Sequence, residues 1–329
     1  MKRFAWLGAV CAVTLGAEHA SAQAPRKLNV LLIVADDLNN HLGCYGSKVV
    51  LSPNIDRIAA RGVRFDRAYC NYPVCNASRT SFLSGRYPEV TKVLNNVTEP
   101  RIALGKDFIF LPELYRGNGY FTARVGKIAH TPFEDALKWD VSETARQAKD
   151  KGAGKMAKAG KDGVPFAWQA TDSADEQEPD GRTARRIVQL IEQNKDRPFF
   201  IAAGFHRPHV PHTAPKKYFE LYPPERMSLP KEPAGHEKQI PAIARGAKYF
   251  PDLTDLQKRQ IISHYHAVTS FMDAQVGVLL EALDRLKLWD NTIVIFVSDH
   301  GYHLGERGQW MKQSLFERSA RNPLIVTGP

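Results

Sequence analysis

Continuous apolar runs that end in acidic or polar residues constrain the fold of this chain more than any other feature of its sequence. The clearest is LNVLLIVADDL, where the apolar run from Leu28 to Val34 is soon followed by Asp36 and Asp37. Hydrophobicity that is continuous rather than alternating predicts strands buried on both faces. Three further runs repeat the pattern: RPFFIAAGFH (197–206), NTIVIFVSDHG (291–301) and NPLIVTGP (322–329).

The segments between these runs carry helical patterns. We expect helices over Pro53–Arg61, with Ser52 as the N-cap, over Gly181–Gln193, and over Leu256–Leu288, where we expect an interruption. Strands that alternate with helices predict an α/β domain whose mostly parallel central sheet is covered by helices on both faces. The last apolar run reads as a core strand at the end of the chain, which suggests a truncated domain.

Potential ligands follow three of the predicted strands, and in open α/β sheets ligands bind beyond the carboxyl ends of the strands. Neighbouring carboxylates repel one another unless a cation lies between them, and oxygen ligands favour Ca²⁺ or Mg²⁺. A polar strand end or a helix cap is the structural alternative for an isolated Ala-Asp-Asp. We expect the long connections 140–179 and 222–251 to be surface excursions beside this site. The strands end in three pairs of such residues: Asp36 and Asp37, His206 and His209, and Asp299 and His300.

The N-terminus has the pattern of a cleaved export signal. Lys2 and Arg3 precede a short apolar run from Phe4 to Leu15, and Ala20-Ser21-Ala22 forms a small-residue cleavage site. The run is short for a bilayer and no stop-transfer segment follows, so residues 1–22 predict a secretory signal peptide. We therefore expect an exported protein, periplasmic or secreted; a retained N-terminal anchor is the alternative. No other stretch predicts a membrane span.

The cysteine content bears on disulfide formation, and the net charge bears on the class of binding partner. Cys11 leaves with the predicted signal, and in an oxidising compartment a disulfide between Cys44 and Cys70 would leave Cys75 unpaired. The formal net charge is +10, and part of the excess lies in the lysine-rich segment 149–161, which we expect to be a solvated loop. Positive charge attracts polyanions. No nucleic-acid-binding module accompanies it, and the export signal argues against DNA or RNA as the partner.

Cys75 lies beside a fixed positive charge, Arg79, at a predicted helix N-terminus. Such an environment stabilises a thiolate, so a nucleophile with a low pKa is one interpretation. A buried structural cysteine is a second. As a third, CNASR followed by TSFLSGRYP strongly resembles the signature of the sulfatase family, in which the cysteine is oxidised to formylglycine. The most frequent form of that signature has proline where Ala77 stands.

The resemblance to the sulfatases extends over essentially the whole mature chain. NVLLIVADDLNNHLGCYG resembles the first strand of the family with its metal aspartates, and GKIAH (126–130) resembles its Lys-and-His active-site element. GFHRPHVPH and SDHGYHLGERGQWMKQSLFE are most similar to the iduronate-2-sulfatase branch. The resemblance implies an alkaline-phosphatase-like α/β fold, with residues 23–329 as the large catalytic domain. It also implies a smaller C-terminal subdomain, which we expect this chain to lack.

The family resemblance implies a chemistry and assigns its residues. Formylglycine at position 75 hydrates to a gem-diol: one hydroxyl attacks the sulfur of a sulfate ester, and the second allows the enzyme-bound sulfate to be expelled. This implies Ca²⁺ as cofactor, a sulfated carbohydrate as substrate, and a formylglycine-generating or anaerobic sulfatase-maturating enzyme as partner. The implied metal ligands are Asp36, Asp37, Cys75, Asp299 and His300. The implied catalytic residues are Cys75, Arg79, Lys127, His130, His209 and Lys312, with His206 and Tyr302 as weaker candidates for substrate binding.

Other functions fit parts of the same pattern. A phosphate ester or phosphonate hydrolase could use the same scaffold, metal and nucleophile geometry. An inactive glycan-binding protein would result if Cys75 were never oxidised. For single residues the structural alternatives are a hydrogen-bonded histidine at His206 and a solvated lysine at Lys127 or Lys312.

Overall fold

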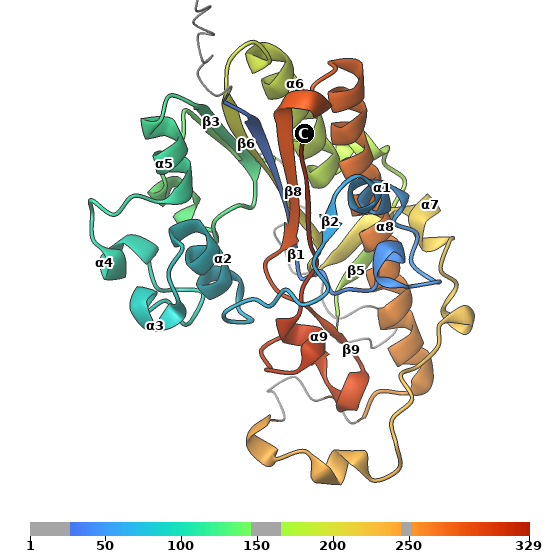
Figure 1. Cartoon of the computed structure of the whole chain (residues 1–329). Helices are drawn as coiled ribbons and strands as arrows, with labels where there is room; N and C mark the ends of the chain where they lie inside the picture. Colours follow the sequence, from blue (N-terminus) through green and yellow to red (C-terminus); the bar gives the residue numbers. More distant parts are fainter. Residues whose placement is uncertain (1–26, 146–165, 245–249, 251) are drawn as a thin grey trace, which may run out of the picture.

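A seven-stranded sheet forms the centre of the computed structural model, which describes residues 27–145, 166–244, 250 and 252–329 (Figure 1). Its strand order is β2-β11-β8-β1-β6-β3-β4, and the five strands from β8 to β4 are parallel. The predicted α/β fold with a mostly parallel sheet is therefore confirmed. The predicted signal peptide and the lysine-rich segment 149–161 lie outside the described residues. The strands are β1 (Asn29–Asp36), β2 (Val63–Arg64), β3 (Phe121–Gly126), β4 (Val141–Glu143), β6 (Phe199–Pro208), β8 (Thr292–Ser298) and β11 (Leu324–Thr327).

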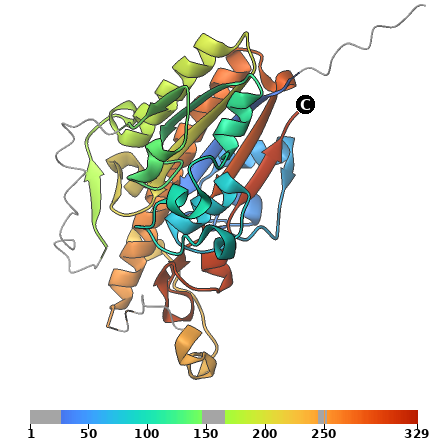
Figure 2. The ribbon, with the colours of Figure 1, turned by 90° about the vertical axis from the view of Figure 1, so that its left-hand side faces the viewer.

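Helices cover both faces of the sheet, which explains why the central strands are continuously apolar. Leu31 and Ile33 of β1 pack in one core cluster with residues of α1 (Pro53–Arg61), α6 (Pro179–Asn194) and α8 (Asp255–Arg285). Leu32 and Val34 face the opposite way, into a cluster with residues of α2 (Cys75–Ser84) and the segment before α5 (Leu111–Gly117). Figure 2, turned by 90°, shows α2 and α5 in front of the strands, together with α3 (Pro88–Thr91) and α4 (Pro100–Leu104).

The helix α8 corrects one prediction, because it runs unbroken for 31 residues. Its start is fixed by a capping box in which the Thr254 hydroxyl accepts from the Gln257 N–H at 3.3 Å. The first half of α8 packs in a separate core cluster next to the sheet. The second half packs against one face of the central sheet. Gly277 lets the helix approach α1, since a Cβ there would lie 2.7 Å from Asn54 Oδ1. Burial of most residues from Ile261 to Leu283 keeps the helix continuous.

The N-terminus of α1 is capped from a distance. Ser52 stands at the predicted N-cap position, but its hydroxyl does not cap the helix; it accepts from the Gly43 N–H at 2.8 Å. The carboxylate of Asp273, in α8, accepts instead from the N–H groups of Asn54 and Ile55 at 3.2 and 2.8 Å. It also accepts from the Asn54 side chain at 2.8 Å. Asp273 thus satisfies donors that a helix start leaves free and joins α1 to α8.

The two long connections agree with the predicted surface excursions to different extents. The connection 140–179 was predicted to be a surface excursion, yet it supplies the edge strand β4 and the strand β5 (Trp168–Thr171), which pairs with β7 (His212–Pro215). The connection 222–251 fits the prediction better, since its described part contains short 3₁₀-helices. These are η4 (Pro224–Arg226), η5 (His236–Gln239) and η6 (Ala242–Ala244).

Two further findings bear on the cysteines and on membranes. Cys44, Cys70 and Cys75 are all free thiols, so the disulfide between Cys44 and Cys70 that the sequence allowed is absent among the described residues. Among those residues, we find no helix with the length and apolar character needed to cross a bilayer.

We predict that Asp273→Ala lowers the free energy of unfolding by about 2–4 kcal/mol, because three donors lose a buried acceptor. The matched control is Asp284→Ala, which removes an exposed ion pair with Arg57, again between α8 and α1. Its loss should cost less than about 1 kcal/mol. Urea unfolding followed by circular dichroism measures the free energy of unfolding of both variants. Equal decreases in the two variants would show that the buried cap contributes no more than the exposed ion pair.

Candidate active site

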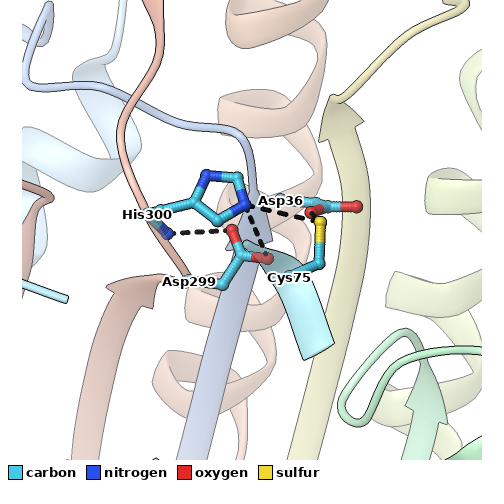
Figure 3. Close-up of side chains that lie close together, drawn as sticks. All are labelled: Asp36, Cys75, Asp299 and His300. Atoms are coloured by element: carbon cyan, nitrogen blue, oxygen red, sulfur yellow. Dashed lines mark hydrogen bonds and ion pairs between the residues drawn. The ribbon is translucent and has the colours of Figure 1, made fainter. Parts of the chain in front are cut away.

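Four predicted ligands meet at the carboxyl end of the sheet (Figure 3). Asp36 ends β1, Asp299 and His300 follow β8, and Cys75 begins α2. One ligand atom from each of these residues lies within 4.8 Å of the others, and all four side chains are buried. A second such group contains Asp37 and Cys75 together with His209. We call Asp36, Asp37, Cys75, Asp299 and His300 the strand-end cluster.

The helix α2 presents Cys75 to this cluster and is itself buried, although much of it is polar. It begins at Cys75, as predicted, and ends before Gly85, which has a left-handed φ of 66°. The Asn76 side chain donates to the carbonyls of Asn95 and Thr98 at 2.9 and 2.8 Å. The Ser78 hydroxyl donates to the carbonyl of Asp299. Because its polar groups are paired, α2 can be buried against the strand ends without leaving unsatisfied donors.

Arg79 lies one turn into α2 and is fully buried beneath the cluster. Its Nε donates to Asp299 Oδ2 at 2.9 Å, and its Nη2 lies 3.5 Å from Asp36 Oδ1. Burial alone would lower the pKa of Arg79, but Asp299 and Asp36 more than offset this, and the net direction is upward. The guanidinium also donates to the carbonyls of Lys127 and Ile128. Arg79 therefore ties the cluster to the loop that follows β3.

Two buried lysines complete the charge balance. Lys127 pairs with Asp36, and Lys312 pairs with Asp37 and donates to Cys75 Sγ at 3.2 Å. Burial alone would lower the pKa of each lysine, but Asp36 raises that of Lys127 and Asp37 raises that of Lys312, so both shift upward. Three carboxylates thus face three permanent cations, counting Arg79.

Two histidines, His300 and His209, are each fixed by a backbone carbonyl at Nδ1 and present Nε2 to other residues of the cluster. Nδ1 of His300 lies 3.0 Å from the Gly301 carbonyl, which can only accept, so this nitrogen carries the proton. Its Nε2 faces Cys75 Sγ at 3.4 Å. His209 is likewise fixed by the Val210 carbonyl, and its Nε2 lies 3.9 Å from Asp37 Oδ2.

Partial burial keeps the imidazoles of His209 and His130 neutral near pH 7. It lowers the pKa of His209 to about 4, and, together with the charges of Lys127 and Arg79, it lowers the pKa of His130 to about 3. His130 follows β3 in the same loop as Lys127. The side chain of His209 is 34% exposed, so it borders the solvent side of the cluster. Neutral imidazoles at these positions can accept protons.

The environment of Cys75 does not fit the thiolate interpretation. Burial and the negative charge of Asp36 raise the pKa of the Cys75 thiol to about 12. A cysteine nucleophile requires the opposite shift. The structural and the oxidised interpretations remain.

The two weaker site candidates, His206 and Tyr302, contact residues outside the strand-end cluster. His206 Nδ1 is 3.7 Å from Asp180 Oδ1, so the ring faces that carboxylate. Tyr302 has no exposed surface, and its ring stacks on Tyr265 with centroids 5.1 Å apart. Neither His206 nor Tyr302 is positioned for direct contact with a bound sugar. Both positions fit better with residues that support the side chains of the site.

Sequence reasoning missed two residues that shape the site. Asp180, at the start of α6, accepts from the N–H groups of His206 and Arg207, both at 2.9 Å, and so fixes the end of β6 before His209. Tyr265, in the first half of α8, contacts the backbone beside Asp37. The motif Glu-Pro-Asp-Gly around Asp180 indicates a helix start, but nothing local in the sequence points to either contact.

The strand-end cluster fits a divalent cation. Asp37 Oδ2 is buried and has no hydrogen-bond partner among the described residues, and such an orphaned carboxylate oxygen is costly unless a cation satisfies it. The cluster offers oxygens from three carboxylates, one imidazole nitrogen from His300 and the sulfur of Cys75, which oxidation to formylglycine would replace by oxygen. Hard cations of the Ca²⁺ and Mg²⁺ type prefer such oxygen-rich sites.

Comparisons with known proteins agree with this geometry. The family model described as Sulfatase matches residues 28–329. The chain is 36% identical to iduronate 2-sulfatase of Homo sapiens, over 98% of this chain and 64% of that protein. It is 32% identical to a sulfatase of Formosa agariphila, over 92% of this chain and 64% of that protein. The chain thus spans about 64% of the length of these relatives.

The fold comparison gives the same result. A phosphonate monoester hydrolase of Agrobacterium radiobacter superposes with a TM-score of 0.76 at 21% identity, over 92% of this chain and 68% of that chain. This likeness concerns the fold and confirms the predicted alkaline-phosphatase-like architecture. With the family model matched over nearly the whole described chain, we conclude that this protein belongs to the sulfatase family.

Proposed function

We propose that this chain forms the catalytic centre of an exported sulfatase that hydrolyses sulfate esters on a sulfated sugar or uronic acid. The observation that carries the proposal is the convergence of Cys75, at the start of α2, with Asp36, Asp299 and His300. The similarity to human iduronate 2-sulfatase supports a sulfated uronic acid as the substrate class. Export rests on the signal pattern of residues 1–22.

The nucleophile in this proposal is Cys75 after oxidation to formylglycine by a formylglycine-generating or anaerobic sulfatase-maturating enzyme. The raised pKa of the unmodified thiol supports this over a thiolate mechanism. A hydrated aldehyde supplies two hydroxyls on one carbon, so one can attack sulfur while the other later drives the release of sulfate. The signature CNASR and the start of a helix at Cys75 are the features that favour this modification.

Calcium is the cation that we propose for the strand-end cluster. Asp36, Asp37, Asp299 and His300 would hold it, together with the oxidised side chain at position 75. When bound, it would supply Lewis-acid stabilisation to the sulfate oxygens. Because three carboxylates already face three permanent cations, a divalent cation would leave the site positive and attractive to a sulfate ester.

The remaining groups are suited to hold the sulfate and to move protons. Lys312 lies 3.2 Å from Cys75 Sγ and Lys127 pairs with Asp36, so both ammonium groups can donate to sulfate oxygens beside position 75. To the neutral His130, which follows β3 in the same loop as Lys127, we assign the removal of the proton from the second hydroxyl. His209 borders the solvent side of the site, and we assign it a position beside the departing sugar oxygen. Arg79 orients Asp299 and the loop that carries Lys127.

We predict that Cys75→Ala abolishes hydrolysis of an aryl sulfate, because no hydroxyl pair can form. Protein co-produced with a maturation enzyme should show, in peptide mass spectrometry, the mass loss that accompanies conversion of the Cys75 thiol to an aldehyde. The corresponding aryl phosphate serves as the comparison substrate. Undiminished turnover by Cys75→Ala would refute the nucleophile, and faster phosphate than sulfate hydrolysis would refute the reaction class.

We predict that calcium raises the melting temperature of the chain and that a chelator reverses the effect. Ligand at about 100 times its dissociation constant stabilises by about 2.7 kcal/mol. Asp299→Asn should reduce the calcium-dependent shift, because a charged ligand is lost while Arg79 keeps an acceptor. Asp284→Asn, an exposed aspartate in α8, is the control and should shift like the unmodified chain. Differential scanning fluorimetry measures all three; no calcium response in the unmodified chain would exclude the site.

A further inference from the structure

The backbone turns sharply at Asp37, directly after β1. Asp37 has a left-handed φ of 69°, which is unusual for a residue with a side chain and unfavourable by about 1 kcal/mol or more. This turn sends the carboxylate of Asp37 toward Lys312 and His300, whose Nε2 lies 3.5 Å from Asp37 Oδ1. The direction of this carboxylate therefore depends on whatever holds the backbone in that conformation.

The hydroxyl of Tyr265 spans the turn. It donates to the carbonyl of Asp37 at 2.7 Å and accepts from the N–H of Asn39 at 2.9 Å. One oxygen thus bridges the two peptide groups that flank Leu38. Tyr265 is completely buried and comes from the first half of α8, which packs in a core cluster beside the sheet. The bridge links the turn to a rigid helix.

Neighbouring contacts hold the same turn from the side of β8. The N–H of Leu38 donates to Ser298 Oγ at 3.0 Å, and the N–H of Asp37 donates to Asp299 Oδ1 at 3.1 Å. The Asn39 side chain donates to the Tyr302 carbonyl at 2.9 Å. Because strain at a single residue persists when its surroundings over-determine it, the turn is fixed by this network.

We propose that Tyr265 is a positioning residue for the metal site: its hydroxyl holds the Asp37 turn and so sets the direction of the Asp37 carboxylate. The inference rests on the calcium site of the proposed function. Residues that orient metal ligands through hydrogen bonds change metal affinity by about 10- to 100-fold when mutated. Loss of the hydroxyl should therefore weaken calcium binding while the aromatic ring keeps its packing.

The test is isothermal titration of calcium into the full chain carrying Tyr265→Phe, with Tyr222→Phe as the matched control. The Tyr222 hydroxyl is also buried, accepts from the Leu51 N–H at 2.8 Å and lies 2.5 Å from Ser270 Oγ of α8. Both variants should lower the melting temperature to a similar extent. Tyr265→Phe should bind calcium about tenfold more weakly, whereas Tyr222→Phe should bind it like the unmodified chain.

The outcomes separate this role from the proposed function. Calcium affinity unchanged in Tyr265→Phe, or weakened equally in Tyr222→Phe, overturns the positioning role and leaves the metal site standing. An unmodified chain that binds no calcium overturns both. If Tyr265→Phe does not fold, Ser298→Ala tests the same turn by removing the acceptor of the Leu38 N–H. Its calcium affinity should also fall, and an unchanged value would contradict control of the site by the turn.

Discussion

Three buried carboxylates at one edge of the sheet create the electrostatic problem around which this structure is arranged. Asp36 ends β1 and Asp299 follows β8, and these strands are neighbours in parallel register, so backbone pairing itself brings the two acids together. An uncompensated buried charge costs several kcal/mol. Arg79, Lys127 and Lys312 supply the compensation from α2, from the loop after β3 and from the segment after β10 (Trp310–Met311).

The need to compensate the three buried carboxylates also accounts for features of the fold that hydrophobic packing does not explain. The helix α2 is buried although polar, because its side chains pair with the Asp299 carbonyl and with a neighbouring loop. Arg79, beneath the cluster, donates to the backbone carbonyl of Lys127. Arg79 and Asp299 are each held by several partners, which preorganises this part of the site before any ligand binds. Such preorganisation is what electrostatic catalysis on a sulfate ester would need.

The sequence predicted those helices and strands whose pattern lies in neighbouring residues, and it failed where distant contacts decide the structure. The strands β1, β6 and β8 and the helices α1 and α6 followed from apolar runs and periodicity. The strand β3 was missed because Thr122 and Arg124 interrupt its apolar pattern; Arg124 is buried through bonds to Ser142 and to the carbonyls of Gly126 and Glu143. The expected break in α8 was wrong because tertiary packing supports the helix from Ile261 to Leu283. At the site, the strand-end ligands came together, whereas His206 faces Asp180 and Tyr302 is fully buried, so the roles of these two stay predictions.

The sequence by itself determined that a covered parallel sheet would carry acids at its strand ends and that Cys75 would stand at a helix start. Both follow from neighbouring residues, through hydrophobic pattern and turn chemistry. The tertiary structure decided which distant side chain would complete each local element: Asp273 at α1, Asp180 at the end of β6, and Tyr265 at the Asp37 turn. Ile55 and Asp273 are 218 positions apart, and Asp37 and Tyr265 are 228 apart. Such partners meet because helices dock on the sheet in one orientation, which no local pattern encodes.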